Sequence, residues 1–398
     1  MSQSTHTLQI ETLTPVHVGS GRNLRGNFDY SIFSQEKQIA MLDERKIFDL
    51  IGRDQLPVWL AMIEKGEDIL PYLRQRKPGL QSSDIARRVA ALPGKEPGIQ
   101  AELREQIHLG AAQYPSIPGS SLKGAIKTAV LATLIRKDPA FVQKEENLSV
   151  MGRKGSMVKD QKILAHYLNQ KENRNRNGEL EPSPNEDAFR FLRISDAYFA
   201  ATSVLPALMF NMGYTDWKAD EKRSPFVECI PAGQITSTRL QMPQDHIQLV
   251  ERKGYMKKNL QFVQELPYLF QTINKHTAHV LQSEIDFWKE EKLDYTALDS
   301  YIEQLEELIQ QTNSIGPNAC ILRLGYGSGW DSMTGRWAKD NDAFGDFILE
   351  EKVWFMVTGA SRPGDSKYGN DVPFPKTRKS AAGAGPMGFV KLSLQKLG

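Results

Sequence analysis

The sequence predicts an α+β fold built from antiparallel sheets with helical insertions. Apolar and polar residues alternate at 7–13 and again at 389–394, which is typical of half-buried strands near the two ends of the chain. Between 256 and 312 the apolar residues recur three or four apart, which is typical of helices. Strands and helices do not alternate as βα units and no internal repeat is visible, so a doubly wound sheet and a solenoid are both disfavoured.

A chain of 398 residues is long for one hydrophobic core, and we therefore expect two domains. The first is expected to span 1–245, with a helical insertion near 55–113 and a mobile loop near 147–183, which is rich in Lys, Arg, Asn, Gly and Glu. The second is expected to span 246–398. It would begin with the helical segment and end in strands separated by glycine-rich loops.

Turn residues and apolar patterns locate the strands of the first domain. A hairpin is expected over 28–42 with its turn at 34–37, and Asp43 is expected to start the helix that follows. Alternation predicts one strand over 189–199. A pair of strands is expected over 226–240, where a Pro-Ala-Gly turn divides the apolar positions.

A helix predicted over 121–136 carries an unusual charge pattern in its first turns. A Pro-Gly pair precedes it, and Ser120 or Ser121 is a suitable N-cap. Lys123 and Lys127 lie near the positive end of the helix, where each cation costs about 0.3–1 kcal/mol. A phosphate bound to the free N–H groups would offset that cost. Two lysines that simply face water are an equal alternative from this stretch alone.

In the second domain, Gly316-Pro317 is expected to end the helical segment. Strands are expected at 322–329 and 347–357, and a long loop at 358–388. In the last strand, apolar residues alternate with Lys, Ser and Gln.

The composition excludes several classes of protein. The formal net charge is only +2, so a nucleic-acid surface would have to come from local clusters of Lys and Arg. Cys229 and Cys320 provide neither a disulfide framework nor a set of metal ligands. Neither a signal peptide nor an apolar run of about 18 residues is visible, so we expect a soluble, cytoplasmic protein.

Residues 383–388 match the spacing G-x-G-x-x-G, but their context does not fit a dinucleotide site. Such a site needs a helix after the glycines, whereas a strand follows here. Clustered glycines also allow the backbone to approach a bulky group such as a phosphodiester. Lys376, Arg378 and Lys379 lie just upstream and supply positive charge. A tight turn that packs against a neighbouring strand is the alternative.

A second glycine-rich stretch, 324–330, places Tyr326 and Trp330 beside Gly325 and Gly327. Either aromatic side chain could stack on an unpaired base, a contact worth about 1–3 kcal/mol. Either could equally belong to the core.

His17 lies between the first predicted strand and the loop at 19–21, close to the candidate phosphate-binding groups. It could act as a general acid or base in RNA cleavage. Because the sequence places no partner carboxylate or second histidine with it, a binding or structural role is favoured. His276 and His279 have a spacing that can suit a metal, but no further ligand completes a site, so no metal or cofactor is expected. No Walker A, nucleophile-elbow or zincin motif is present, and the sequence does not favour an enzyme.

Five stretches, distributed over essentially the whole chain, resemble motifs of the RAMP superfamily of CRISPR-associated proteins. Residues 13–21 resemble its first signature, 117–124 its second, and 383–392 its glycine-rich loop with the strand that follows. Residues 194–199 and 322–335, the latter containing Gly-Trp-Asp-Ser, narrow the resemblance to the family of fifth subunits of type III-A (Csm) effector complexes.

The resemblance implies two RRM-like (ferredoxin-like) RAMP domains with helical insertions. It also implies a non-catalytic subunit at one end of a ribonucleoprotein, which caps the 3′ part of the single-stranded guide RNA (crRNA) and is needed for crRNA maturation and antiviral defence. The implied partners are crRNA, the repeated Csm backbone subunit, the small Csm subunit, a separate host nuclease and target RNA. In some other RAMP proteins an early histidine is catalytic, so the alternative is a metal-independent crRNA-processing endoribonuclease that uses His17.

The motifs and the basic clusters together give the residues expected to bind RNA. They are His17, Gly19, Ser20, Gly21, Ser120, Ser121, Lys123, Lys127, Gly325, Gly327, Trp330, Lys376, Arg378, Lys379, Gly383, Gly385 and Gly388.

Overall fold

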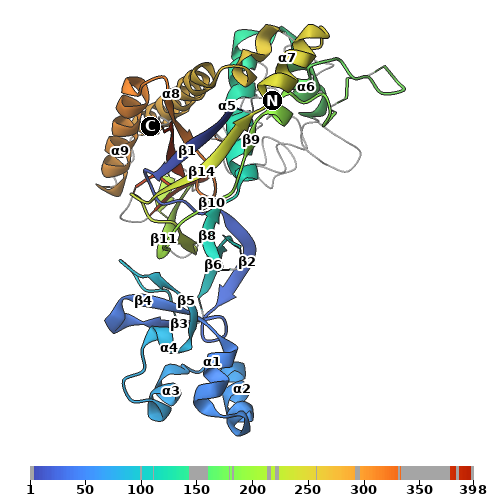
Figure 1. Cartoon of the computed structure of the whole chain (residues 1–398). Coiled ribbons are helices and arrows are strands. Elements are labelled where there is room, and N and C mark those ends of the chain that lie inside the picture. The colour runs from blue at the N-terminus through green and yellow to red at the C-terminus, as the bar shows by residue number, and fades with distance from the viewer. Residues whose placement is uncertain are drawn as a thin grey trace.

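The structure is a computed structural model of the chain, shown in Figure 1. No helix among the residues it describes is long and apolar enough to cross a membrane. The described residues are 4–98, 101–110, 112–142, 160–178, 180–181, 183–212, 217–219, 224–256, 258–291, 296–329, 332, 377–381 and 385–395.

One sheet joins strands from near the two ends of the chain. Its strands are antiparallel throughout, and the strands predicted at 7–13 and 389–394 are confirmed and pair directly with each other. Strands from both sides of residue 245 share this sheet, so the expected domain boundary does not separate one sheet from another. In spatial order the sheet contains β15 (Ala319–Arg323), β17 (Phe389–Leu394), β1 (Ser4–Thr12), β14 (Ile235–Met242) and β9 (Arg193–Ile194).

A layer of helices covers the apolar face of this sheet. Leu122 and Ile126 of the predicted helix, which is confirmed, lie in one buried cluster with Leu8 and Ile10 of β1. Burial of these alternating strand residues against a helical stripe is the main contribution to stability in this lobe. The helices of the layer are α5 (Gly119–Lys137), α6 (Asp160–Leu168), α7 (Gln244–Arg252), α8 (Leu266–Glu291) and α9 (Thr296–Ser314).

A second sheet carries the predicted hairpin over 28–42, which is confirmed, and it packs against four short helices. Asp43 begins the first of these helices, because its side chain accepts hydrogen bonds from the backbone N–H groups of Arg45 and Lys46. The helices are α1 (Glu44–Ile51), α2 (Leu56–Lys65), α3 (Leu70–Arg76) and α4 (Ser82–Ile85). The strands are β2 (Gly19–Arg25), β6 (Glu102–Gln106), β13 (Phe226–Cys229), β11 (Ser203–Met212), β5 (Ala86–Ala91), β4 (Gln38–Leu42) and β3 (Tyr30–Phe33), with β12 (Trp217–Ala219) and β16 (Thr377–Ala381) also paired to β11.

The molecule is elongated, with an upper and a lower lobe in Figure 1. The upper lobe contains the five-stranded sheet and helices α5 to α9. The lower lobe contains β3, β4, β5 and helices α1 to α4, while β2 and β6 lie between the lobes. A small third sheet also lies at this junction, formed by β10 (Ala197–Tyr198), β8 (Tyr114–Ile117) and β7 (His108–Leu109).

Four expectations from the sequence need correction. The helical insertion near 55–113 is helical only in its first part, because β5, β6 and β7 lie within its second part. The loop expected near 147–183 contains helix α6, which buries Ile163 and Tyr167. The strand expected over 189–199 is a short 3₁₀ helix followed by two short strands in different sheets.

The fourth correction concerns the pair of strands expected over 226–240. Both strands exist, as β13 and β14, but they belong to different sheets and do not pair with each other. In addition, the strand expected at 322–329 is confirmed only as the end of β15, because its second part is a glycine-rich loop. The strand expected at 347–357 lies outside the described residues.

Candidate functional site

Three glycine-rich segments far apart in sequence meet at one junction in the upper lobe. The backbone N–H of Tyr326 donates to the carbonyl oxygen of His17 at 2.8 Å, which joins the second glycine-rich stretch to the first motif. The N–H of Leu324 donates to the carbonyl oxygen of Gly388 at 2.8 Å, and the N–H of Gly388 donates to that of Pro15 at 2.9 Å. The motifs identified separately in the sequence therefore form one structural unit.

The glycines are required at this junction because the chain approaches itself closely. A Cβ atom on Gly325 would lie 2.4 Å from the carbonyl oxygen of His17, and one on Gly388 would lie 2.2 Å from that of Leu324. Both glycines also have positive φ angles, 79° and 89°, which other residues rarely adopt. Their close approaches are thus to protein backbone, which is the tight-turn interpretation of these motifs.

A groove of about 290 Å³ lies between this junction and helix α5. It brings the second motif of the sequence, at the start of α5, next to the glycine-rich loop after β15. Its lining contains hydroxyl and backbone groups beside apolar side chains, and the guanidinium of Arg323 is already bonded to Glu284 at 2.7 Å and to the carbonyl oxygens of Met387 and Gly327. The lining residues are Val18, Ser121, Gly124, Ala125, Thr128, Arg323, Leu324, Gly325, Ser328 and Ser332.

The start of α5 is capped differently from the expectation. The helix begins at Gly119 after Pro118, so neither Ser120 nor Ser121 is its N-cap, and that prediction is wrong. The carboxylate of Asp196 accepts a hydrogen bond from the Gly119 N–H at 2.8 Å. An internal carboxylate therefore already interacts with the positive end of the helix dipole.

The two lysines of α5 have different surroundings. Lys127 forms an ion pair with Asp187 and lies 5.9 Å from the centre of the Phe189 ring. Lys123 is half-buried, and burial is the main reason why its pKa is lowered; Lys127 and Arg193 lower it further, while Asp187 raises it. The carboxylate of Asp187 thus pairs with Lys127, and Lys123 forms no ion pair with another described residue.

His17 is almost completely buried, with 2% of its surface exposed. Its Nδ1 donates to the carbonyl oxygen of Glu228, 2.5 Å away, and its ring meets Tyr326 edge to face at 5.6 Å. Gly19 lies beside the second ring nitrogen, since a Cβ atom on it would be 3.2 Å from Nε2. Burial lowers the pKa of His17, which is therefore neutral at pH 7. In this structure His17 attaches the first motif to β13.

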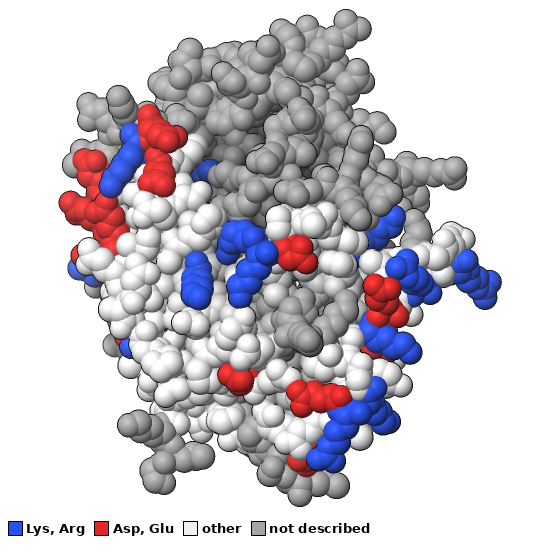
Figure 2. Space-filling view, turned by 90° about the horizontal axis from the view of Figure 1, so that it is seen from above, with Lys and Arg blue, Asp and Glu red and all other residues white. Residues whose placement is uncertain are grey.

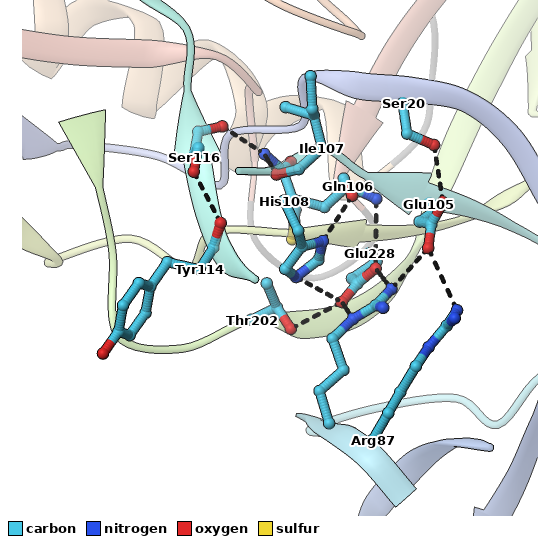
Figure 3. A network of polar contacts seen from close by, with 12 residues as sticks. Ser20, Arg87, Glu105, Gln106, Ile107, His108, Tyr114, Ser116, Thr202 and Glu228 are labelled. Atoms are coloured by element: carbon cyan, nitrogen blue, oxygen red, sulfur yellow. Dashed lines mark hydrogen bonds and ion pairs between the residues drawn. The ribbon is translucent and has the colours of Figure 1, made fainter. Parts of the chain in front are cut away.

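Glu228 is the centre of a buried polar network that the sequence did not reveal (Figure 3). Its carboxylate accepts hydrogen bonds from Arg88 at 3.0 and 3.2 Å and from the Thr202 hydroxyl at 3.0 Å. His108 Nε2 lies 3.6 Å from it, and burial lowers the pKa of this histidine. Because these partners are scattered along the chain, no local sequence signal marks the network.

Ser20 lies at the edge of the same network. Its hydroxyl donates to Glu105 at 2.9 Å, and Glu105 also pairs with Arg88 at 2.9 Å. Burial of Glu105 acts to raise its pKa, but the hydrogen bond from Ser20 and the contact with Arg88 together lower it. Gly19 and Gly21 are exposed, and Gly21 has no atom within 4 Å of the position of a Cβ.

The remaining candidate residues lie near the last strands. Arg378 is buried over the Phe287 ring at 4.6 Å, and Lys379 is half-buried. Cβ atoms on Gly327 and Gly385 would contact protein side chains, those of Met387 and Gln304 respectively. Three candidates lie outside the described residues: Trp330, Lys376 and Gly383.

Two observations limit the chemistry that the described surface supports. Among the described residues, no group of three or more His, Cys, Asp or Glu side chains could hold a metal ion. In the described part of the view from above, acidic and basic side chains are interspersed and no large face of one sign is seen (Figure 2). Binding of a polyanion would therefore depend on local clusters, as the net charge indicated.

The fold and the candidate site together define the class of protein to which the chain belongs. This is an α+β protein whose first and last described strands pair in one antiparallel sheet, and whose glycine-rich loops meet beside a long helix. The RAMP superfamily model matches residues 9–330, and the chain belongs to the RAMP superfamily.

Two solved structures share this fold. One is a chain of the "Cryo-EM structure of Csm-crRNA-target RNA ternary complex in type III-A CRISPR-Cas system", with 21% identity, a TM-score of 0.65, and coverage of 98% of this chain and 100% of the other. The second is the crystal structure of T. onnurineus Csm5, with 21% identity, a TM-score of 0.63, and coverage of 96% and 99%. No curated protein sequence matches the chain.

Proposed function

We propose that this chain is a non-catalytic, crRNA-binding subunit of a type III-A CRISPR (Csm) ribonucleoprotein that caps the 3′ part of the guide. The observation that carries the proposal is a shared fold over nearly the full length of both chains with a subunit of a Csm–crRNA–target RNA complex. The shared fold with a Csm5 protein agrees with the resemblance of the motifs to the fifth Csm subunits, and that resemblance implies the position at the end of the complex. The proposed partners are crRNA, target RNA, the repeated and the small Csm subunits, and a separate nuclease in crRNA maturation.

The proposal includes two RRM-like units, one for each large sheet. An antiparallel sheet with α5 and α8 on one face supports the first unit, and the sheet around the hairpin at 28–42 supports the second. The proposed units divide between the two large sheets and not at residue 245, because β1 and β17 pair in the same sheet.

The groove beside α5 is the proposed path of the RNA backbone. Ser120 is exposed and Ser121 lines the groove, so both hydroxyls are available to phosphate oxygens. Lys123, in the first turns of α5, forms no ion pair with a described residue, whereas Lys127 must first exchange Asp187 for a phosphate. Contacts of this kind hold the backbone without reading the bases.

The burial of His17 argues against the alternative of an endoribonuclease. A general acid or base must reach the proton that it transfers, but Nδ1 of His17 is bonded to the carbonyl oxygen of Glu228 and only 2% of the residue is exposed. Incubation of the purified chain with a crRNA precursor, with and without EDTA, tests this point. Cleavage that survives EDTA and is lost in His17→Ala would replace the proposal with the nuclease.

The proposal itself is tested by the guide content of purified complexes. In Lys123→Ala and Lys127→Ala chains we expect weaker guide binding across sequences, with the larger effect at Lys123. Each lost phosphate contact should reduce the slope of log affinity against log salt by about 0.7. The matched control is Lys289→Ala, since Lys289 pairs with Glu306 between α8 and α9. Unchanged guide content and salt slope in both variants would remove the phosphate contacts of α5.

A further inference from the structure

A second basic cluster lies where the two large sheets meet, and the function proposed above does not use it. Its centre is Tyr326, which the glycine loop presents between Gly325 and Gly327 and whose N–H is bound to His17. The guanidinium carbon of Arg104, on β6, lies 4.7 Å from the centre of the Tyr326 ring. The ammonium group of Lys379, on β16, lies 4.4 Å from the same centre. Arg104, Tyr326 and Lys379 are called the Tyr326 cluster below.

Within the part of the chain that the structure describes, the two cations of the Tyr326 cluster have no carboxylate partner. Neither Arg104 nor Lys379 forms an ion pair with a carboxylate among the described residues, whereas Arg88, on β5 of the same sheet, contacts two. Glu102 precedes Arg104 on β6, but its carboxylate accepts a hydrogen bond from Asn23. Burial lowers the pKa of Lys379 and the nearby Arg104 lowers it further. The ring attracts both cations, but it does not neutralise them.

The Tyr326 cluster holds two positive charges against one ring. Arg104 lowers the pKa of the half-buried Lys379, so the two like charges repel each other and an anion near them would relieve that repulsion. Arg104 is exposed, so an anion can reach the cluster from solvent. The ring fixes the two cations against one platform, and the positive φ angles of Gly325 and Gly327 fix the ring, so little side-chain freedom is lost on binding.

We infer that the Tyr326 cluster binds a backbone phosphate of single-stranded RNA at the junction of the two lobes. The inference rests on the proposed function and adds a contact outside the α5 groove. Phosphate suits the cluster because its oxygens can accept hydrogen bonds from the guanidinium and the ammonium group at once. Gly325 lines the groove and is adjacent to Tyr326, so one strand can pass from the groove to the cluster. An acidic partner protein is the competing occupant and is an outcome of the test.

The test measures binding of a fluorescent single-stranded RNA of mixed sequence to the full-length chain at salt concentrations between about 50 and about 200 mM. The variants are Arg104→Ala with Lys379→Ala, and Tyr326→Phe, which keeps the ring. The control is Lys289→Ala with Lys391→Ala, since it removes the same charge from two lysines that pair with glutamates. Thermal unfolding of each variant shows that it is folded.

In the Arg104/Lys379 double variant we expect affinity to fall about tenfold at the physiological salt concentration and the salt slope to fall by about 1.4, for two cations at about 0.7 each. Tyr326→Phe and the control should keep the slope of the unmodified chain. An unchanged affinity and slope in the folded double variant overturns the inference while RNA binding by the unmodified chain upholds the proposed function.

Two further outcomes also decide against the Tyr326 cluster. If the double variant loses assembly with its protein partners but keeps the salt slope for RNA, the occupant is an acidic protein surface. If the unmodified chain and its assembled complex bind no RNA, the proposed function and the inference both fail.

Discussion

The two basic regions beside the groove differ in how their charge is compensated. At the start of α5, Lys127 pairs with Asp187, and the helix end is capped by Asp196. At the Tyr326 cluster, Arg104 and Lys379 share an aromatic ring but have no carboxylate partner among the described residues. The sequence predicted phosphate binding at the first region, because its two lysines are four residues apart at the start of a helix. Among the described residues, the second region contains two cations without a carboxylate partner, whereas one of the two lysines at the start of α5 is already paired.

The difference shows that a basic pattern in a sequence is a weak guide to anion binding. A cation that already has an internal anion must lose that partner before it can bind a phosphate. The free energy lost with the first partner then reduces the free energy gained from the phosphate. A cation that is partly desolvated beside a like charge gains more from the same phosphate. The predictions below test this contrast between compensated and uncompensated charge.

The largest loss of stability is expected at Glu228, a fully buried carboxylate that is paired with a cation. Glu228→Gln should lower the free energy of unfolding by about 3–5 kcal/mol, because it leaves Arg88 buried without one of its carboxylates. Urea unfolding followed by circular dichroism measures the loss. The control is Glu102→Gln, an exposed carboxylate on β6, for which we expect a change within about 0.5 kcal/mol. Similar losses in both variants would show that the loss of stability in Glu228→Gln does not come from the buried network.

A pH effect is expected from the two neutral histidines of the same region. The pKa values of His17 and His108 are lowered chiefly by burial, so both stay neutral in the folded chain while the unfolded chain takes up protons below about pH 6.5. Stability is therefore present above this pH and decreases as the pH falls, by up to about 1.4 kcal/mol per pH unit and group. His17→Gln should reduce the dependence in unfolding experiments between about pH 7.5 and pH 5.5. If the pH dependence of the free energy of unfolding is the same in His17→Gln as in the unmodified chain, His17 does not contribute to it.

A smaller effect is expected at the cap of α5. Asp196→Ala should destabilise the chain by about 1 kcal/mol, because it leaves the Gly119 N–H without its acceptor. Asp196→Asn keeps an acceptor and removes the charge, so we expect a smaller loss of stability and a tighter affinity for RNA at low salt. Weaker RNA binding by a folded Asp196→Asn chain would contradict a compensating role for this carboxylate.

The smallest effect on stability is expected when a carboxylate is introduced into the Tyr326 cluster. Arg104→Glu places a carboxylate near Lys379 and should raise the free energy of unfolding by no more than about 1 kcal/mol, as for an exposed ion pair. The same change should weaken RNA binding more than Arg104→Gln does. Denaturant unfolding and RNA titration of both variants provide the comparison, and a destabilised Arg104→Glu chain would show that the cluster does not concentrate positive charge.

Regular local patterns allowed much of the fold to be predicted. Strict alternation identified β1 and β17, and the apolar stripe identified α5, because each signal lies within one element. The strands β5 and β6 were missed. β5 contains two arginines and several alanines, which give little alternation, and it is a strand because β4 and β11 pair with it.

The candidate site was only partly predictable, because its partners are distant in sequence. The glycine motifs were found as local patterns, but their meeting through Pro15, His17 and Leu324 depends on the pairing of β1 with β17. The capping of Gly119 by Asp196 and the pairing of Glu228 with Arg88 join residues far apart in sequence. No periodic pattern in the sequence therefore indicates them. Tyr326 was singled out as a stacking or core residue, yet its interaction with two cations from other strands was not visible in the sequence.

The central position of β1 has a consequence for synthesis on the ribosome. Its neighbour β14 is translated more than half the chain later and its neighbour β17 almost the whole chain later, so the five-stranded sheet depends on contacts of long sequence separation, which form slowly. The hairpin of β3 and β4 has only local contacts and can fold early. While β1 waits for β17, Leu8 and Ile10 stay unprotected in the nascent chain, and the upper lobe is the part that would need a chaperone.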